Sequence, residues 1–176
     1  MPPTIFTKNI EEIKKFTKKY KKIVIKPIHG YGGKNILFVN KLINQIKVLN
    51  YIKKFGHIMV QKFIPQVTKG DKRVFIINGL VKGAIQRVPQ KGSFVSNLAQ
   101  GGKAVETKLN YKELKISKIV AKHLKKNQIF FAGIDLVSNY LIGDINVTSP
   151  TGLKNFKDLS GINLAKDFWN NLEKLK

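Results

Sequence analysis

The spacing of apolar residues predicts four amphipathic helices, over residues 9–20, 41–55, 110–126 and 161–175. Two of them begin with capping-box spacing, Asn9 with Glu12 and Asn110 with Glu113. The side chains expected to face inward are Ile10, Ile13, Phe16 and Tyr20 in the first helix, Leu42, Ile46, Leu49, Ile52 and Phe55 in the second, and Ile162, Ala165, Phe168 or Trp169 and Leu172 in the last.

Shorter apolar runs predict strands between these helices. Their ranges are 23–27, 35–39, 58–63, 73–77, 80–88, 129–137 and 141–148. Asn78-Gly79 is a strong signal for a two-residue hairpin turn. Because hairpins dominate, the sheets should be mostly antiparallel and the fold class α+β. Two lobes are expected, 1–56 and 57–176, and the polar loop 89–103 is long enough to suggest a functional role.

The composition narrows the function classes. The 176 residues include no cysteine, which excludes disulfides and thiol catalysis. The start does not resemble a signal peptide and no apolar run is long enough to span a bilayer, so a cytoplasmic protein without a membrane partner is expected. The net charge of +23 invites a nucleic-acid interpretation. However, the lysines are spread over almost every segment, as AT-rich coding would produce, so no specific nucleic-acid partner is predicted.

Two scarce acidic residues interrupt apolar strands near the C-terminus. If Asn139-Tyr140 is the turn, Asp135 faces Asp144, and Asn146 lies on the same face. Such a pair persists if one carboxyl is protonated or if a cation lies between them. Oxygen ligands of this kind favour Mg²⁺ or Mn²⁺. The alternative is that both acids face solvent at a hairpin end.

A glycine-rich turn with Gly30, Gly32 and Gly33 follows a strand that carries Lys26. Backbone N–H groups of such a turn can approach phosphate oxygens, and the lysine suggests a phosphate contact. The alternative is an ordinary turn and an outward-facing lysine. The segment Gln61-Lys62-Phe63-Ile64 before Pro65 can present backbone groups to a purine edge.

Arg73 and Arg87 are the only arginines of the chain and share one predicted hairpin. A strict two-residue Asn-Gly turn would place them on opposite faces, whereas a three-residue loop with a bulge would place them on the same face. No Ser-His-Asp or His-Glu-x-x-His arrangement exists in the sequence. The residues therefore indicate a magnesium–phosphate site that acts by charge neutralisation and positioning.

In this order and spacing, the motifs resemble the ATP-grasp portion of bacterial glutathione synthetase. They are Ile25-Lys-Pro27 with Gly30-Tyr-Gly-Gly33, Gln61-Lys-Phe-Ile-Pro65, Lys69-Gly-Asp-Lys-Arg-Val74, Arg87-Val-Pro89, Asn97 with Gly101-Gly102, Gly133-Ile-Asp135 and Asp144-Ile-Asn-Val-Thr-Ser-Pro-Thr-Gly152. The resemblance implies ATP held between two antiparallel sheets, one in each lobe. It also implies phosphorylation of γ-glutamylcysteine by ATP, followed by attack of glycine on the acyl phosphate.

The resemblance further implies a role for each matching residue. Nucleotide contacts would come from Lys26, the glycines of the turn, Gln61 to Ile64 and, beside the ribose and phosphates, Asp71. Arg73 and Arg87 would hold the transferring phosphoryl group. Residues 89–102, with Asn97, would form a loop that shields the acyl phosphate from water. Asp135, Asp144 and Asn146 would bind magnesium.

The sequence departs from the family pattern in places. The family has a further N-terminal domain before the matching region, and its second metal carboxylate is usually glutamate, which is Asp144 here. Val95 replaces a loop arginine, and Asn155 matches a glutamate that helps hold the peptide substrate.

Three interpretations remain open at this point. The chain is part of a split synthetase whose other half is supplied in trans, or a relic that binds Mg·ATP without catalysis, or a basic polyanion-binding protein. The family commonly forms tetramers, so a homo-oligomer is a further expectation.

Overall fold

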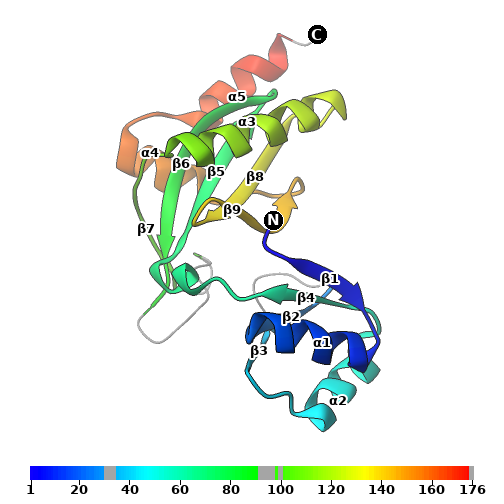
Figure 1. Cartoon of the computed structure of the whole chain (residues 1–176). Helices are drawn as coiled ribbons and strands as arrows, with labels where there is room; N and C mark the ends of the chain where they lie inside the picture. The colour runs from blue at the N-terminus through cyan, green and yellow to red at the C-terminus, as the bar shows by residue number, and fades with distance from the viewer. Residues whose placement is uncertain (30–34, 91–97, 99–100, 175–176) are drawn as a thin grey trace. The chain divides into compact units, whose positions relative to one another are not determined.

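The computed structural model describes residues 1–29, 35–90, 98 and 101–174, except for the side chains of Gly143 and Asp144 (Figure 1). The chain divides into two compact units, Met1–Pro65 and Gln66–Lys176. All strand pairs are antiparallel in the part described, which confirms the α+β class. The first unit extends past the expected boundary at residue 56, because the strand after it pairs within the first sheet.

In its described residues, 1–29 and 35–65, the first unit has one four-stranded sheet and two helices. The strand order is β1-β4-β2-β3. The elements are β1 (Thr4–Thr7), α1 (Ile10–Tyr20), β2 (Lys22–Pro27), β3 (Leu37–Asn40), α2 (Gln45–Phe55) and β4 (Ile58–Lys62).

One face of this sheet packs against both helices. Ile23 and Ile25 of β2 lie in the core with Ile58 and Val60 of β4, because alternate side chains of a strand share a face. Helix α1 buries Ile13 and Phe16 there, as the periodicity predicts.

Helix α2 differs from the prediction. Val48 is its one buried residue, while Ile52 and Phe55 pack at the edge of the core. Leu42 and Ile46 are 86% and 74% exposed, and Leu49 is exposed as well. The expectation that these three face inward is therefore wrong. The helix begins only at Gln45, and within this unit its apolar stripe is wider than the face that meets the sheet.

The second unit contains a five-stranded sheet in the order β7-β6-β5-β8-β9. Its elements are the 3₁₀ turn η1 (Pro65–Lys69), β5 (Asp71–Ile77), β6 (Leu80–Val88), β7 (Lys103–Glu106), α3 (Tyr111–Lys126), β8 (Phe131–Val137), β9 (Tyr140–Asn146), α4 (Leu153–Ser160) and α5 (Leu164–Glu173).

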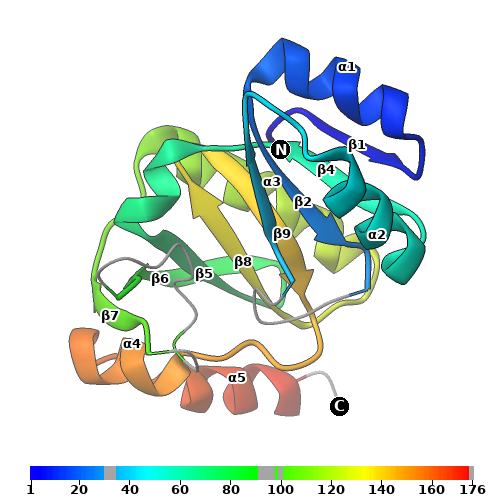
Figure 2. The same ribbon diagram turned by 90° about the horizontal axis from the view of Figure 1, so that it is seen from below.

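Helices cover both faces of this sheet (Figures 1 and 2). On one face, α3 packs Ala121 and Leu124 against Val74 and Ile76 of β5. On the other, α4 and α5 contribute Phe156, Leu164 and Phe168 to a cluster that includes Phe75, Ile77 and Ile85. Strand β5 is thus buried on both sides, which explains its continuous apolar run.

The first hairpin of this unit determines where the arginines point. Asn78 and Gly79 have φ of 49° and 73°, and Ile77 pairs with Leu80, so the two-residue turn is confirmed. A bulge follows, because Phe75 pairs with Gly83 while Ile76 pairs with Val81. The bulge shifts the register by one residue, which turns the rest of β6 over. Arg87 therefore stands opposite Asp71, on the same face as Arg73. The two arginines share a face through a bulge in the strand and not through a longer loop.

The second hairpin corrects the predicted register. Its turn residues are Ser138 and Asn139, both with positive φ, and Val137 pairs with Tyr140. Asp135 consequently faces Ile142 and not Asp144. Nearer the strand end, Gly133 pairs with Asn146, so β9 has three residues where β8 has one. Asp144 lies within this irregularity.

Several elements are absent from the sequence-based prediction. Strands β1 and β7, with four residues each, and helix α4 cover stretches for which no element was predicted. The last helix, α5, begins only at Leu164, so Ile162 lies before it and is exposed; Trp169 is exposed as well, and Leu164 is buried instead. The capping box at Asn110 and Glu113 is confirmed, whereas the Asn9 side chain accepts from the N–H of Glu11 and not of Glu12.

Gly70, which joins η1 to β5, has a conformation that an L side chain rarely adopts. Its φ is +98°, and a Cβ placed there would lie 2.1 Å from the carbonyl oxygen of Arg87. We expect Gly70→Ala to lower the free energy of unfolding by about 3 kcal/mol, since strained backbone and a backbone clash combine. Urea unfolding followed by the fluorescence of Trp169, the single tryptophan, measures this unit.

Gly161→Ala is the matched control in the same unit. Gly161 also has positive φ, +75°, but nothing lies within 4 Å of its added Cβ. The loss expected for Gly161→Ala is about 1 kcal/mol. Equal losses for the two variants would show that the close approach to Arg87 is not a constraint.

Candidate functional site

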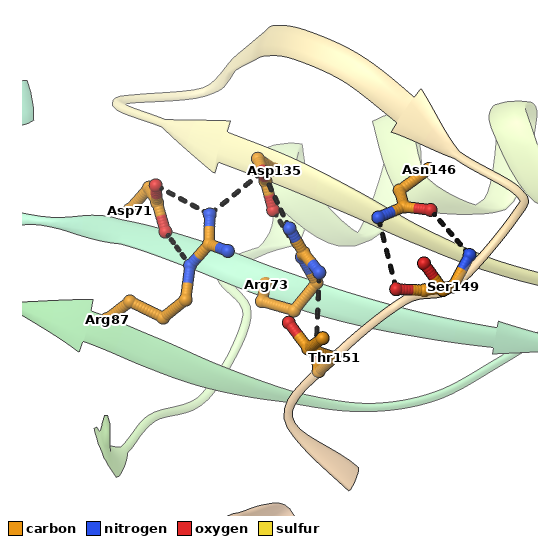
Figure 3. Close-up of polar contacts among 7 residues, drawn as sticks. All are labelled: Asp71, Arg73, Arg87, Asp135, Asn146, Ser149 and Thr151. Atoms are coloured by element: carbon orange, nitrogen blue, oxygen red, sulfur yellow. Dashed lines mark hydrogen bonds and ion pairs between the residues drawn. The ribbon is translucent and has the colours of Figure 1, made fainter. Parts of the chain in front are cut away.

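Four charged side chains gather on one face of the second sheet (Figure 3). Asp71 and Arg73 come from β5, Arg87 from β6 and Asp135 from β8. Arg87 is the cross-strand partner of Asp71, and Asp135 is that of Arg73. Pairing across neighbouring strands places their side chains together, so the register alone assembles the cluster. We call these four residues the charged quartet.

Each arginine of the quartet binds a carboxylate through two nitrogens. Arg87 donates from Nε to Asp71 Oδ1 at 2.6 Å and from Nη2 to Asp71 Oδ2 at 2.8 Å. Arg73 donates from Nε to Asp135 Oδ1 at 2.5 Å and from Nη2 to Asp135 Oδ2 at 3.0 Å. Arg87 Nη2 is also 2.8 Å from Asp135 Oδ2. The two pairs are therefore linked through Asp135.

The quartet is shielded from water. Asp71, Arg73 and Arg87 are buried, and the Asp135 side chain is 18% exposed. Burial of the Arg87 guanidinium disfavours its charge, but the hydrogen bond that it donates to Asp71 and the negative charge of Asp135 outweigh that effect and raise the pKa of Arg87. Two positive and two negative charges make the quartet neutral, which is what allows it to be buried.

Gly133 leaves room for the Arg73 side chain, because glycine has no Cβ. A Cβ at Gly133 would lie 3.0 Å from Arg73 Cδ and 3.0 Å from Pro150 Cβ. On the far side, Arg73 Nη1 donates to the carbonyl oxygen of Thr151 at 3.4 Å. The segment after β9 therefore helps to hold the guanidinium over the sheet (Figure 3).

Asn146 lies at the end of β9 on the face of the quartet, because its partner Gly133 precedes Asp135 by two residues. Its Oδ1 accepts from the N–H of Ser149 at 3.1 Å, and its Nδ2 donates to the carbonyl oxygen of Ser149 at 3.4 Å. Asp144 lies in the same strand, but its side chain is outside the described part.

The donor chemistry of Asp135 and Asn146 fits a Mg²⁺ ion, which prefers carboxylate and amide oxygens. No group of three or more His, Cys, Asp or Glu side chains that could hold a metal occurs among the residues described. Both oxygens of Asp135 are also bound by guanidinium groups. The arginines thus neutralise the charge of Asp135. The sequence alone suggested two arrangements, Asp135 facing Asp144 or both acids facing solvent, and neither includes these arginine contacts.

In the first unit, the sheet face opposite the helices carries polar groups from three strands. Lys26 Nζ donates to Gln61 Oε1 at 3.1 Å, and Gln61 Nε2 donates to Thr4 Oγ1 at 2.9 Å. Gln61 is buried. On the same sheet face, Phe6 and Phe38 are exposed. A cation beside apolar rings suits a ligand that has both an anionic and an aromatic part.

The segment after Gln61 turns its side chains to different sides. The Lys62 ammonium lies 5.9 Å from the ring centroid of Tyr20, on the helix-covered face. Phe63 stacks edge-to-face with Phe38 at 4.8 Å, and its N–H donates to the carbonyl oxygen of Lys22. The structure thus brings Lys26, Gln61 and Phe63 to one sheet face and places the Lys62 side chain on the other. Ile64 follows in the connection to η1.

Four of the predicted site residues, Gly30, Gly32, Gly33 and Asn97, lie outside the described residues. The sequence prediction also contains no pairing of Asp71 with Arg87. The signal that could have found it is that both residue types are scarce in this chain, with two arginines and ten acidic residues, and that Asp71 and Arg87 belong to adjacent strands.

The model of the prokaryotic glutathione synthetase ATP-grasp domain matches residues 1–161. The chain belongs to this family. It is 42% identical to glutathione synthetase of Prochlorococcus marinus subsp. pastoris in an alignment of 163 residues that covers 91% of this chain and 53% of that protein. Glutathione synthetase of Bradyrhizobium diazoefficiens is 35% identical, with coverages of 98% and 56%. The chain spans about half the length of the curated relatives it matches.

Solved structures agree on the fold of this ATP-grasp family member. The ATP-grasp ligase PsnB complexed with minimal precursor superimposes with a TM-score of 0.67 at 15% identity, covering 92% of this chain and 51% of that one. D-alanyl-alanine synthetase A from Vibrio cholerae gives a TM-score of 0.61 at 12% identity, with coverages of 85% and 51%. The ATP-grasp fold expected from the motifs is confirmed.

The pairing of Asp71 with Arg87 predicts a large stability effect. Asp71→Asn removes one negative charge beside a buried guanidinium, so we expect the free energy of unfolding to fall by about 3 kcal/mol. Asp158→Asn is the control in the same unit, because Asp158 forms an exposed i,i+4 pair with Lys154. That change should cost less than about 0.5 kcal/mol. Urea unfolding of both variants tests the comparison, and similar small losses would contradict it.

Proposed function

We propose that this chain binds Mg·ATP and acts as the ATP-grasp part of an ATP-dependent ligase that joins γ-glutamylcysteine to glycine. The observation that carries the proposal is the gathering of Arg73, Arg87 and Asp135 on one sheet face, in a chain of the glutathione synthetase family. Planar guanidinium forks match phosphoryl oxygens in geometry and charge.

The proposed reaction needs no side-chain nucleophile. The γ-phosphoryl group of ATP moves to the C-terminal carboxylate of γ-glutamylcysteine, and ADP leaves. The glycine amine then attacks the carbonyl carbon of the acyl phosphate, loses a proton and displaces inorganic phosphate. Arg73 and Arg87 neutralise negative charge on the transferring phosphoryl group, which lowers the barrier by electrostatic stabilisation.

Each other predicted residue has a proposed role, and that of Asp71 is to lie beside the ribose and phosphates. Lys26 and Gln61 are proposed nucleotide contacts, with the backbone of Lys62, Phe63 and Ile64 beside the base. Asp135, Asn146 and Asp144 would hold Mg²⁺, which would supply positive charge to neutralise the phosphate groups. A related structure is described as PsnB complexed with minimal precursor, Mg and ADP, which is consistent with this cofactor pair. The glycine turn and the loop with Asn97 stay predictions.

Because the chain spans only part of its relatives' length, the proposed function has two forms. Relatives are about twice as long, so a catalytically complete protein requires the remaining length from another polypeptide or from more of this one. The alternative is an impaired chain that still binds Mg·ATP. A cytoplasmic location and a homo-oligomer stay predictions; no helix of the described residues combines the length and apolar character that a bilayer crossing requires.

Mg·ATP should raise the melting temperature of the chain, since a ligand that binds the folded state stabilises it by about 2.7 kcal/mol at a hundredfold excess over Kd. Differential scanning fluorimetry measures the shift. Lys26→Met should reduce it, because a phosphate-directed charge is lost. Lys53→Met, an exposed lysine of α2 in the same unit, is the matched control and should leave the shift unchanged. The absence of any shift with saturating Mg·ATP would refute the nucleotide site.

Release of ADP in the presence of γ-glutamylcysteine and glycine tests catalysis. We expect turnover only when a polypeptide covering the rest of the relatives' length is added, because that length supplies further substrate contacts by resemblance. Turnover of the chain alone would contradict this dependence. Binding of Mg·ATP without turnover under either condition would favour the impaired alternative.

A further inference from the structure

The carboxylate proposed to hold the metal is bound by both arginines of the quartet. Arg73 contacts Asp135 Oδ1 at 2.5 Å and Oδ2 at 3.0 Å, and Arg87 Nη2 contacts Oδ2 at 2.8 Å. A metal ion that bound Asp135 in this arrangement would have to displace guanidinium nitrogens or lie beside two positive charges. Neither is favourable in a site with so little water.

The same pairing restrains the arginines. A phosphate group that approached Arg73 or Arg87 alone would compete with Asp71 and Asp135 for the same nitrogens. The described quartet has no net charge, so it attracts neither a lone cation nor a lone anion strongly. A cation and an anion that arrive together can exchange partners with it, because Asp135 turns to the cation while the guanidiniums turn to the anion.

We infer that the quartet couples the two halves of its ligand: the divalent cation binds well only when an oxyanion has drawn the guanidiniums away from Asp135. The inference rests on the proposed function and concerns the order of binding at that site. Thermodynamic linkage makes the coupling reciprocal, so the cation strengthens oxyanion binding by the same factor.

Asp71 is a positioning residue in this scheme. It binds Nε and Nη2 of Arg87 at 2.6 and 2.8 Å, and this two-point contact fixes the plane of the guanidinium. Arg87 can therefore give up its contact with Asp135 without leaving the site. Arg73 has no such second carboxylate among the described residues, and its other contact there is the longer bond to the Thr151 carbonyl oxygen at 3.4 Å. Arg73 is thus the more easily displaced of the two.

Removing Arg73 should uncouple the cation from the oxyanion. In the full chain without nucleotide, we expect Arg73→Met to bind Mn²⁺ at least tenfold more tightly than the unaltered chain, measured by the electron paramagnetic resonance signal of free Mn²⁺. Asp135→Asn added to Arg73→Met should abolish the gain. Lys118→Met, which removes an exposed charge on α3, controls for net charge and should change Mn²⁺ affinity little.

Sulfate tests the coupling without any substitution. Sulfate is an oxyanion that binds guanidinium groups and complexes Mn²⁺ only weakly. Mn²⁺ should bind the unaltered chain several-fold more tightly in sodium sulfate than in sodium chloride of equal ionic strength, and Arg73→Met should show a smaller sulfate effect. Equal Mn²⁺ affinity in the two salts would overturn the inference, as would equal affinity of Arg73→Met and the unaltered chain.

These outcomes are separable from the proposed function. A chain that Mg·ATP stabilises, but whose Mn²⁺ affinity ignores both sulfate and Arg73, keeps the nucleotide site and loses the coupling. A chain that Mg·ATP does not stabilise loses the nucleotide site, whatever its Mn²⁺ affinity.

Discussion

The second unit depends on one electrostatic constraint, which is that its buried charges must cancel. Arg87 and Asp71 lie in the interior of the sheet face, and Arg73 and Asp135 lie beside them. A charge in such surroundings is tolerated only when it is paired and hydrogen-bonded, and each of these four groups has a partner within 3.0 Å. Any strand register that separated one member from the rest would leave an unpaired charge. The quartet therefore selects the register as well as depending on it.

The bulge between β5 and β6 shows how local geometry serves this constraint. Without it, the Asn78-Gly79 turn would direct Arg87 to the face that α3 covers, among Val74, Ala84 and Leu124. One extra residue in β6 reverses that outcome. Gly70 and Gly133 act in the same direction, because each leaves room for an arginine where a side chain would collide with it. The turn, the bulge and the two glycines thus position the charged side chains of the site without carrying charge themselves.

Sequence patterns predicted the elements whose signals are local. The Asn78-Gly79 turn, the Asn110 capping box and the apolar face of α1 each depend on neighbours within a few residues. What failed depends on distant partners. The outward face of α2 follows from how little of that helix the sheet covers, and β1 exists because β4 offers an edge. Asp135 was interpreted through Asp144, since a one-residue error in the turn changes every cross-strand pair; its real partners, Arg73 and Arg87, lie more than forty positions away.

The charged quartet can stabilise the fold even in a chain that has lost catalysis. The charges of its four residues cancel without any ligand. Folding alone therefore requires these residues, whether or not the chain catalyses a reaction. Their presence is strong evidence for the ATP-grasp fold and weaker evidence for turnover. Groups that the packing does not require are more informative. Phe6 and Phe38 stay exposed beside the Lys26–Gln61 hydrogen bond, and although Phe38 contacts Phe63, neither ring lies on the sheet face that the helices cover. An open apolar and cationic face of this kind is better explained by a ligand than by folding, which favours a chain that still binds nucleotide.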